Sequence, residues 1–514
     1  MEQTVNKQQE QRPPYGLLAV LMVAAFIAFL NNTLLNIALP SIMNDLKVEA
    51  STVQWLTTGY MLVNGILIPT TAFLIQKYSV RKLFIAALAL FLTGTILAGV
   101  AHEFSILLIG RMTQASGSAI LMPLLMNVML VSFPVEKRGA AMGVFGLILM
   151  GAPAIGPTLS GWLVEHYNWR MLFHFVTPIA VIVFLLGIFL IKDKKQTVNI
   201  TLDYFSVVLS SVGFGGLLYG FSSAGSKGWD SPYVYGTIIA GVIGLTWFIL
   251  RQIKQEKPML NFKIFRYPMY ALSVSISMVV TMAMFSGMLL LPIYTQNLRG
   301  ITPFDAGLML LPGAIMMAVM SPINGRLFDK YGGRVLAIIG LTITVITSYF
   351  FSQLTLETTY TNLVILYTVR MFGMSMVMMP VSTNGLNQLP AKYYPHGTAM
   401  NNTLQQVSGA IGTALLVTAM SNRAETRGQE LAEEATKNAS SMTTQPTAEQ
   451  ISQMKQQIMM QSTLDGINFA FYISVFIAAL ALFLAFFIKR AKQADDIIES
   501  KEAMKAMPKL ADNN

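Results

Sequence analysis

Arg111 is a cation inside an apolar stretch that runs from residue 105 to residue 130. If this stretch crosses a membrane, the charge costs several kcal/mol unless it faces water or a partner. A fixed positive charge at a cavity wall can lower the pKa of a nearby carboxyl group or relay protons through water. The structural alternative is that the side chain reaches the surface and pairs with lipid phosphate. Arg370 lies in a second such stretch, and a structural role is as plausible there as a functional one.

Other titratable groups are scarce in the apolar stretches. The carboxylates of Asp203, Asp305, Asp329 and Asp465 all fall near stretch ends, and the four histidines are widely spread. Asp305 and His174 are the remaining titratable candidates inside or at the mouth of a stretch. Each also has an ordinary structural interpretation.

Several kinds of chemistry are excluded by what the chain lacks. It has no cysteine, so disulfides, iron–sulfur clusters and thiolate metal sites are excluded, and the histidines form no ligand cluster. No Walker A motif is present, and no Ser/His/Asp or paired-carboxylate arrangement indicates an enzyme. We therefore expect no metal and no cofactor, and any transport would have to be driven by an ion gradient or by the substrate's own gradient.

The composition indicates an integral membrane protein. Of the 514 residues, 54% are hydrophobic and only 12% are charged, which is too apolar for a water-soluble chain of this length. A spanning helix needs roughly 20 apolar residues. Fourteen stretches satisfy this, at 16–40, 52–75, 83–101, 105–130, 139–164, 171–191, 203–223, 233–250, 269–293, 304–326, 335–353, 361–385, 397–420 and 464–488. The first is too long for the core of a cleaved signal peptide.

The charge distribution predicts the orientation. If both termini are cytoplasmic, the cytoplasmic tails and loops hold 24 of the 35 Lys and Arg residues and the outer loops hold eight. This asymmetry follows the positive-inside rule. Contact with anionic lipid then accounts for the net charge of +10, and no nucleic-acid partner is needed.

A weak internal repeat divides the chain. Residues 74–81 match 327–334 at an offset of 253, Arg111-Met112 matches Arg370-Met371 at an offset of 259, and residues 154–159 match 410–415 at an offset of 256. Three matches in one order at nearly one offset predict two homologous halves of six spans, with spans 7 and 8 inserted between them. Two parallel halves around a midplane site are typical of secondary transporters.

The stretch 151–162 carries a small-residue stripe. Ala152, Gly156 and Ser160 are spaced by four residues, so one face of a helix has almost no side chain and a second helix can approach closely. Two prolines within the stretch are tolerated inside a packed bundle. The simplest interpretation is a tight helix contact, and the functional one is a seam on which two bundles move.

Short motifs follow one another along nearly the whole chain. They are Asn36-Ile37-Ala38-Leu39-Pro40, Gln54-Trp55-Leu56, Arg81-Lys82, Arg111-x-x-Gln114, residues 151–162, Trp169-Arg170-x-x-Phe173, Glu256-x-Pro258-Met259-Leu260, Gly325 to Arg334, and Gly409 to Thr413. Together they resemble the major facilitator superfamily, specifically its 14-span drug:proton antiporter branch of the EmrB/QacA type. The resemblance implies an all-α polytopic membrane protein with the major facilitator fold, built of two six-helix bundles plus two inserted helices.

The resemblance assigns roles to particular residues. Residues 151–162 resemble the antiporter motif of the family, whose positions here are Gly151, Pro153, Gly156, Pro157 and Gly161. Together with the repeat, this favours the interpretation of the stretch as the seam between the halves. In the family, the residue matching Arg111 is implicated in proton transfer.

The two gating loops of this sequence match the family pattern to different extents. An acidic residue at a helix end engages arginines across the bundle interface in such loops. The second loop has the full pattern in Gly325, Asp329, Gly332 and Arg334, whereas the first, which ends in Arg81 and Lys82, has Ala72, Gln76 and Ser79 where Gly, Asp and Gly are usual. We expect a weaker charge lock at the first loop.

Span 1 departs from the family in a residue that bears on the proton path. Asn31 stands where Asp is common, and an amide does not titrate. Proton coupling would then depend on Arg111 with Asp305 or His174.

The candidate cavity groups are amides and thioethers, which suit neutral or weakly charged amphipathic molecules, because a desolvated cation needs a counter-charge. They are Asn31, Asn32, Asn36, Asn64, Gln114, Asn127, Asn401, Asn402, Gln405, Met282 and Met316. Ordinary packing or lipid contact is the alternative for the methionines.

The sequence therefore predicts five regions. They are a cytoplasmic tail (1–15), an N-terminal six-helix bundle (16–191), a linker with two inserted spans (192–268), a C-terminal six-helix bundle (269–488) with an extracytoplasmic, partly helical loop (421–463), and a second cytoplasmic tail (489–514). The predicted function is multidrug efflux by proton antiport across a bacterial-type plasma membrane. The alternatives are export of one endogenous metabolite or lipid-like compound, and a sensor or scaffold without transport. We expect a monomer whose partners are small molecules, protons and lipids, with the use of an accessory adaptor left open.

Overall fold

The computed structural model describes residues 14–48, 50–53, 55–192, 202–256, 258–440 and 448–490. Its main helices are α1 (Tyr15–Leu46), α2 (Ala50–Val53), α3 (Trp55–Lys77), α4 (Val80–Gly99), α5 (Phe104–Ser132), α6 (Arg138–His166), α7 (Met171–Leu190), α8 (Tyr204–Lys227), α9 (Pro232–Lys254), α10 (Pro268–Ile293), α11 (Pro303–Tyr331), α12 (Gly333–Phe351), α13 (Tyr360–Ser375), α14 (Met378–Asn387), α15 (Tyr394–Ser440) and α16 (Ala448–Ala485). The single-turn elements η1 (Val135–Lys137), η2 (Phe262–Arg266), η3 (Tyr294–Leu298) and η4 (Ala391–Tyr393) lie between them.

All fourteen expected stretches fall on helices. Within the described residues, twelve helical segments are long and apolar enough to cross a membrane, and the two remaining stretches lie on α6 and α15. The stretch 361–385 is broken at Met376 and Val377 into α13 and α14. Large apolar side chains such as Phe189, Trp247 and Phe476 stay exposed around the bundle, which fits a surface that faces lipid.

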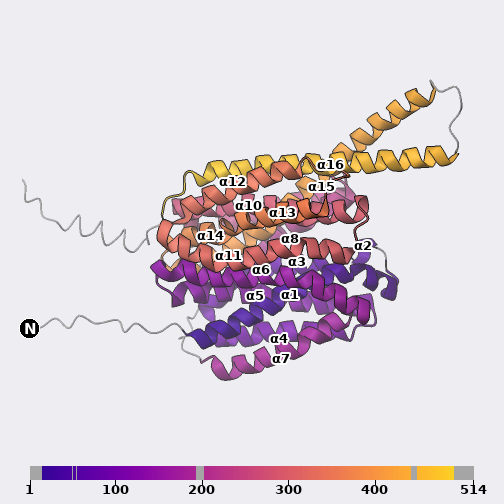
Figure 1. Ribbon diagram of the computed structural model, residues 1–514. Helices are drawn as coiled ribbons and strands as arrows, with labels where there is room; N and C mark the ends of the chain where they lie inside the picture. The colour runs from indigo at the N-terminus through magenta and orange to yellow at the C-terminus, as the bar shows by residue number, and fades with distance from the viewer. Residues whose placement is uncertain are drawn as a thin grey trace, which may run out of the picture.

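The helices form two bundles that meet along α6 and α11 (Figure 1). Helices α1 and α3–α7 pack with one another, and α10–α16 pack with one another. The halves also meet where α3 packs against α15. The inserted helices α8 and α9 form a pair, and α8 packs on both α3 and α15, so this pair covers one of the two contacts between the halves.

The described residues of the segment 421–463, which are 421–440 and 448–463, form two helical extensions. Helices α15 and α16 continue past the bundle and diverge at their far ends (Figure 1). The described part of this segment is helical, in agreement with the prediction of a partly helical loop. Arg427 on α15 pairs with Asp465 on α16 at 3.0 Å, which ties the two helices where they leave the bundle.

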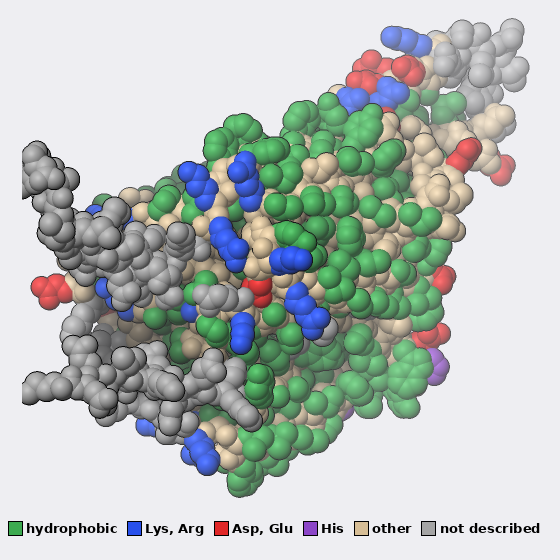
Figure 2. Space-filling view, turned by 60° about the vertical axis from the view of Figure 1, so that its left-hand side comes forward, with side chains coloured by type: hydrophobic (Ala, Val, Ile, Leu, Met, Phe, Trp, Pro, Cys, Tyr) green, Lys and Arg blue, Asp and Glu red, His purple; other side chains and the backbone are tan. Residues whose placement is uncertain are grey.

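Positive side chains gather at one end of the bundle. Figure 2 shows Lys and Arg on the end where α1 begins and α16 finishes. Both terminal helices therefore have their outer ends on the same, positively charged side. Most of the two predicted tails lies outside the described residues.

Candidate functional site

Arg111 lies at the centre of a buried amide cluster. It is fully buried on α5, and its Nη1 donates to the Asn31 Oδ1 at 2.8 Å and to the Gln114 Oε1 at 2.6 Å. Nη2 donates to the Asn32 Oδ1 at 3.3 Å, and the guanidinium carbon lies 4.3 Å from the centre of the Tyr60 ring. The expectation that Arg111 faces partners inside the protein is confirmed, and the alternative of reaching lipid phosphate is wrong.

The cluster extends across four helices. Gln114 passes the network on by donating from Nε2 to the Thr95 hydroxyl at 2.8 Å. Helices α1, α3, α4 and α5 thus meet around one cation whose described partners are all neutral. The Asn31 amide occupies the position at which a carboxylate would form an ion pair with Arg111.

Arg370 is the repeat partner of Arg111, and its surroundings differ. It is also fully buried, and its Nη2 donates to the Ala283 carbonyl and to the Ser286 hydroxyl, both at 2.7 Å. The rings of Phe351 and Phe471 lie 5.7 and 6.0 Å from the guanidinium. Its Nε and Nη1 have no hydrogen-bond partner in the described part of the chain.

The second gating loop is fastened to the first half by Asp329. Its two carboxylate oxygens accept from the backbone N–H groups of Gly139 and Ala140, each at 2.9 Å. These N–H groups belong to the first turn of α6, where a negative charge is stabilised by the helix dipole. The lock at this loop therefore includes a charge on a helix N-terminus, besides any pairing with arginines that the family implies.

The first gating loop is fastened by neutral groups. Gln76 is in the last turn of α3, and its Nε2 lies 3.1 Å from the Nε2 of His396 in the first turn of α15. The repeat offsets of 253 and 256 relate Gln76 to Asp329 and His396 to Ala140. The two contacts are therefore repeat equivalents with different chemistry, and the weaker charge lock expected at the first loop stays a prediction.

The remaining gating residues have peripheral roles. Arg81 Nη2 donates to the Ile188 carbonyl at 2.9 Å, and the Lys82 N–H donates to Ser79 at the start of α4. Arg334 is exposed. Gly332 has a φ of 81°, a conformation that favours glycine, at the turn between α11 and α12.

The small-residue stripe of Ala152, Gly156 and Ser160 contacts α1, within the first half. A Cβ on Gly156 would lie 2.3 Å from the Thr33 hydroxyl, and Ser160 donates to the Leu34 carbonyl at 2.6 Å. Thr33 and Leu34 are on α1, in the same half as α6. Gly161 on the same helix faces Phe304 of α11, in the second half, so the interpretation of residues 151–162 as part of the seam stays a prediction. The side chains of Pro153 and Pro157 lie outside those described.

The contact between α6 and α11 is closest at an earlier row of glycines on α6. Gly139, Gly143 and Gly146 of α6 face α11, where a Cβ on Gly143 would lie 2.6 Å from the Ser321 carbonyl. On α11, a Cβ on Gly325 would lie 2.2 Å from the Gly139 carbonyl. The halves therefore touch backbone to backbone at the end of the bundle that carries Asp329.

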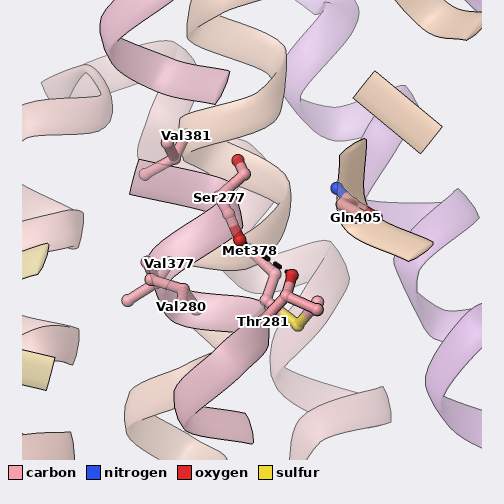
Figure 3. A pocket seen from close by; sticks show the side chains of 7 residues that line it. All are labelled: Ser277, Val280, Thr281, Val377, Met378, Val381 and Gln405. Carbon is pink, nitrogen blue, oxygen red and sulfur yellow. Dashed lines mark hydrogen bonds between the residues drawn. The ribbon is translucent and has the colours of Figure 1, made fainter. Parts of the chain in front are cut away.

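A small cavity lies inside the second half, between α10, α14 and α15 (Figure 3). Its volume of about 10 Å³ holds about one water molecule. It is lined by Ser277, Val280, Thr281, Val377, Met378, Val381 and Gln405. The Ser277 hydroxyl is buried without a described partner, whereas Thr281 donates to the Ser277 carbonyl.

The structure separates the other predicted cavity residues. Asn401 donates to the Ser382 hydroxyl and Asn402 to the Thr398 carbonyl, so both are tied within the second half. Met282 packs where Gly412 of α15 crosses α10. Asn64 is buried, and Asn127 and Met316 are half-buried. The Asn36 side chain lies outside those described.

The two titratable candidates lie at the surface. Asp305 accepts from the Thr302 hydroxyl at 2.8 Å, and its own N–H donates back to Thr302, which forms a cap at the start of α11. His174 is exposed on α7 beside Gly99. The described hydrogen bonds of Arg111 include neither residue.

Comparison with known proteins decides the family. The Major Facilitator Superfamily model matches residues 21–413. The chain belongs to the major facilitator superfamily. It is a membrane transporter and not an enzyme, and the resemblance to drug-resistance transporters of the EmrB/QacA type is confirmed.

Two curated relatives and one solved structure illustrate the match. The uncharacterized MFS-type transporter YhcA of Bacillus subtilis is 52% identical over 81% of this chain and 79% of its own. The lincomycin resistance protein LmrB of the same organism is 43% identical over 95% of this chain and 99% of its own. The crystal structure of the human organic anion transporter MFSD10 has a TM-score of 0.64 and 13% identity over 92% of this chain and 100% of its own, and it supports the fold alone.

Sequence reasoning missed His396 and Arg138 as gate residues. Arg138 lies with its guanidinium 4.9 Å from the Tyr394 ring centre and donates to the Asn387 Oδ1 at 3.3 Å, so it links α6 to the second half. Both residues stand immediately before or at the start of a predicted span. Extending the match of 154–159 with 410–415 backwards by about four helical turns would have paired His396 with Ala140 at the start of α6.

Proposed function

We propose that the chain exports amphipathic, neutral or weakly charged compounds by proton antiport, with the two bundles giving alternating access. The observation that carries the substrate class is that the described partners of the buried cations Arg111 and Arg370 include no carboxylate. The Arg111 cluster offers amide and aromatic groups, and the cavity between α10, α14 and α15 offers hydroxyl, amide and thioether groups. No acidic residue lies in the middle of a span, so a desolvated dication has no counter-charge there.

Relatives that confer drug resistance support export as the direction of transport. LmrB is named for resistance to lincomycin, and this chain matches nearly its whole length. The orientation that goes with export places both termini, and the positive end seen in Figure 2, in the cytoplasm of a bacterial-type plasma membrane. The partners are then small-molecule substrates, protons and lipids, with the chain working as a monomer.

Arg111 is the residue that we assign to coupling. Its Nε has no described hydrogen-bond partner, so the guanidinium can take up a water or a substrate acceptor when the bundle opens. Asp305 and His174 are retained as the titratable members of the proposal. Both side chains are exposed near the beginnings of their helices.

Proteoliposomes test the proposal directly. We expect substrate-dependent proton flux that collapses in Arg111→Ala and persists in Arg370→Ala. A pH-jump assay on Asp305→Asn and His174→Ala tests the titratable members, and unchanged coupling in both would remove them. Flux of a single endogenous compound would favour the metabolite exporter, whereas absence of flux for every ligand, with a stoichiometric partner protein, would favour the scaffold.

Drug susceptibility gives the substrate class. An efflux-deficient bacterial host is compared with and without the chain against cationic, neutral and anionic compounds. We expect protection mainly against neutral and weakly charged amphiphiles. Protection confined to permanent dications would contradict the proposed substrate class.

A further inference from the structure

His396 is the buried histidine of this chain. It is 4% exposed, whereas His102, His166 and His174 are exposed. It begins α15 just before the predicted span 397–420, on the side of the bundle where α3 ends. It therefore lies in the contact between the two halves.

Both ring nitrogens of His396 face neutral groups. Nδ1 accepts the backbone N–H of Asn261 at 3.3 Å, and Nε2 lies 3.1 Å from the Gln76 amide. The Gln76 Nε2 also donates to the Ala72 carbonyl at 2.9 Å, which holds this amide against the end of α3. One imidazole thus joins α3 of the first half, α15 of the second half and the segment that leads out of the inserted helices.

That segment is itself fastened to α8 and α9. The Gln252 Oε1 accepts from the Leu260 N–H at 3.1 Å, and its Nε2 donates to the Ser206 hydroxyl at 2.7 Å. Met259 and Leu260 are buried, so the segment shields the imidazole from water. Opening the α3–α15 contact is the movement that would hydrate His396.

Protonation conflicts with this arrangement. A protonated imidazole donates from both nitrogens, so Nδ1–H would point at the Asn261 N–H, which is also a donor. The ring would also carry a positive charge at the N-terminus of α15, where the helix dipole is already positive. The donor–donor conflict ends once the contact is open, and water then screens the effect of the α15 dipole on the ring.

The charged groups nearby do not offset the conflict. Lys77 on α3 lies over the Phe73 and Tyr78 rings, and Lys392 on η4 lies over the Tyr393 ring. Glu256 and Lys263 flank the buried segment, and neither forms an ion pair with His396 in the described part of the chain. Burial lowers the pKa of His396 to about 4, with a smaller opposing effect from the Met259 carbonyl.

We infer that His396 is a proton-sensitive latch on the cytoplasmic gate, which is closed while the imidazole is neutral and released when the cytoplasm acidifies. The inference rests on the proposed alternating access and describes its regulation by cytoplasmic pH. The other gate holds a carboxylate on backbone N–H groups and contains no corresponding imidazole. Acid would therefore act on the α3–α15 contact first.

The size of the effect follows from linkage. The open state has an ordinary histidine pKa of about 6.5, and the closed state has the lowered value, so the open state binds more protons below about pH 6.5. The closed-to-open ratio should be insensitive to pH above about 7.5 and should fall roughly tenfold between pH 8 and pH 5.5.

Paired spin labels measure the gate itself. The chain has no cysteine, so Tyr78→Cys and Lys392→Cys introduce two unique labelling sites on exposed positions of the two halves. Double electron–electron resonance distances in the full chain, without substrate, should show a longer population that grows on acidification. His396→Gln, which stays neutral, should abolish this growth, and His166→Gln, at an exposed histidine, should preserve it.

The variant Gln76→Asp should reverse the direction in which the gate responds to acidification. A carboxylate at this position pairs with protonated His396 in the closed state, so acidification should close the gate instead of opening it. The inference is overturned if the His396→Gln protein titrates like the parent, if the Gln76→Asp protein opens on acidification, or if the parent does not titrate. Because the readout needs no substrate and no flux, a failure of proton antiport in proteoliposomes would leave this result independent.

Discussion

The α6–α11 and α3–α15 contacts are the same joint built twice with different chemistry. At the first, Asp329 binds the N-terminus of α6, and the helices cross at Gly139 and Gly325 with backbone in contact. At the second, Gln76 meets His396, and the residue equivalent to Gly325 is the buried Ala72. The first joint is charged and tight, whereas the second is neutral, looser by a methyl group, and covered by α8.

The difference separates two requirements of a gate. A fixed charge on backbone N–H groups gives strong closure that responds little to pH in the neutral range. A buried imidazole gives weaker closure that responds to protons. The covering helix α8 packs its Leu218 where Gly65 of α3 leaves room, so the looser joint gains support from outside the repeat.

The largest break in this comparison is expected from Gly325→Ala. Its new Cβ would lie 2.2 Å from the Gly139 carbonyl, and backbone cannot move aside cheaply. Overpacking of this kind costs about 3 kcal/mol at the upper end of its usual range. We expect the closed gate to lose most of its population in spin-label distances measured with Lys137→Cys and Tyr331→Cys.

The matched control is Ala72→Gly at the equivalent position of the other joint. This change removes one methyl group and should cost about 1 kcal/mol. Equal opening by the two variants would show that the joints are equivalent in spite of their different packing.

A second contrast concerns the buried arginines. Arg111→Met leaves the Asn31 and Gln114 amide oxygens without their donor, which should cost about 2 kcal/mol of unfolding free energy. Arg370→Met removes a cation with two unpartnered nitrogens and leaves the Ser286–Ser474 hydrogen bond in place, so it should be neutral or stabilising. Thermal unfolding in detergent measures both, and a loss in the Arg370 variant as large as that in the Arg111 variant would contradict the contrast.

Asp329→Asn sharpens the difference between the gates. The new amide oxygen can accept from only one of the Gly139 and Ala140 N–H groups, and the amide nitrogen faces the other. One charge-assisted hydrogen bond is therefore lost, which should destabilise the closed state by about 1.5 kcal/mol. We expect the closed-to-open ratio, measured with the same Lys137→Cys and Tyr331→Cys spin labels, to fall roughly tenfold at every pH between 5.5 and 8. A shift that disappeared at pH 5.5 would place the proton-sensitive group at this gate and not at His396.

The sequence predicted the scaffold well because its signals are local or repeated. Span length, the positive end and the matches at offsets of 253 to 259 depend on composition and spacing alone, and each expected stretch is helical. Arg111 could also be identified from the sequence, because a cation within a span is costly unless it has a partner or faces water.

The sequence could not assign the contacts of residues 151–162, because a bare stripe shows that a helix is close but not which one. Gly156 and Ser160 face α1, and the close inter-half contact uses Gly139 and Gly143, about four to six turns earlier on the same helix. His396 was missed for a related reason. Its role comes from Gln76, which is 320 residues away, and from Asn261, so only the assembled gate makes a buried imidazole out of an ordinary polar position.

The smallest expected effect tests the comparison at the opposite end of the bundle. Asp45 at the end of α1 accepts from the Arg170 Nη1 at 2.8 Å and from the Trp169 Nε1 at 3.0 Å. These hydrogen bonds, that of Arg170 foremost, lower the pKa of Asp45. Near the equivalent position of the second half, an arginine has a neutral partner. Arg299 donates to the Thr358 carbonyl at 2.6 Å.

A lowered carboxyl pKa stabilises the folded state above the unfolded value, and the stabilisation is lost as pH falls through the folded value. Asp45→Asn should therefore cost only about 0.5 kcal/mol at pH 7, because the carboxylate is 47% exposed and solvent screens the pair, and this cost should shrink as pH falls through the folded pKa. Arg299→Gln removes a hydrogen bond to a carbonyl, which does not titrate, so its cost should be the same at both pH values. Thermal unfolding of the two variants and the parent at pH 7 and at low pH separates the two ties, and a pH-independent cost for Asp45→Asn would show that this carboxylate acts only through packing.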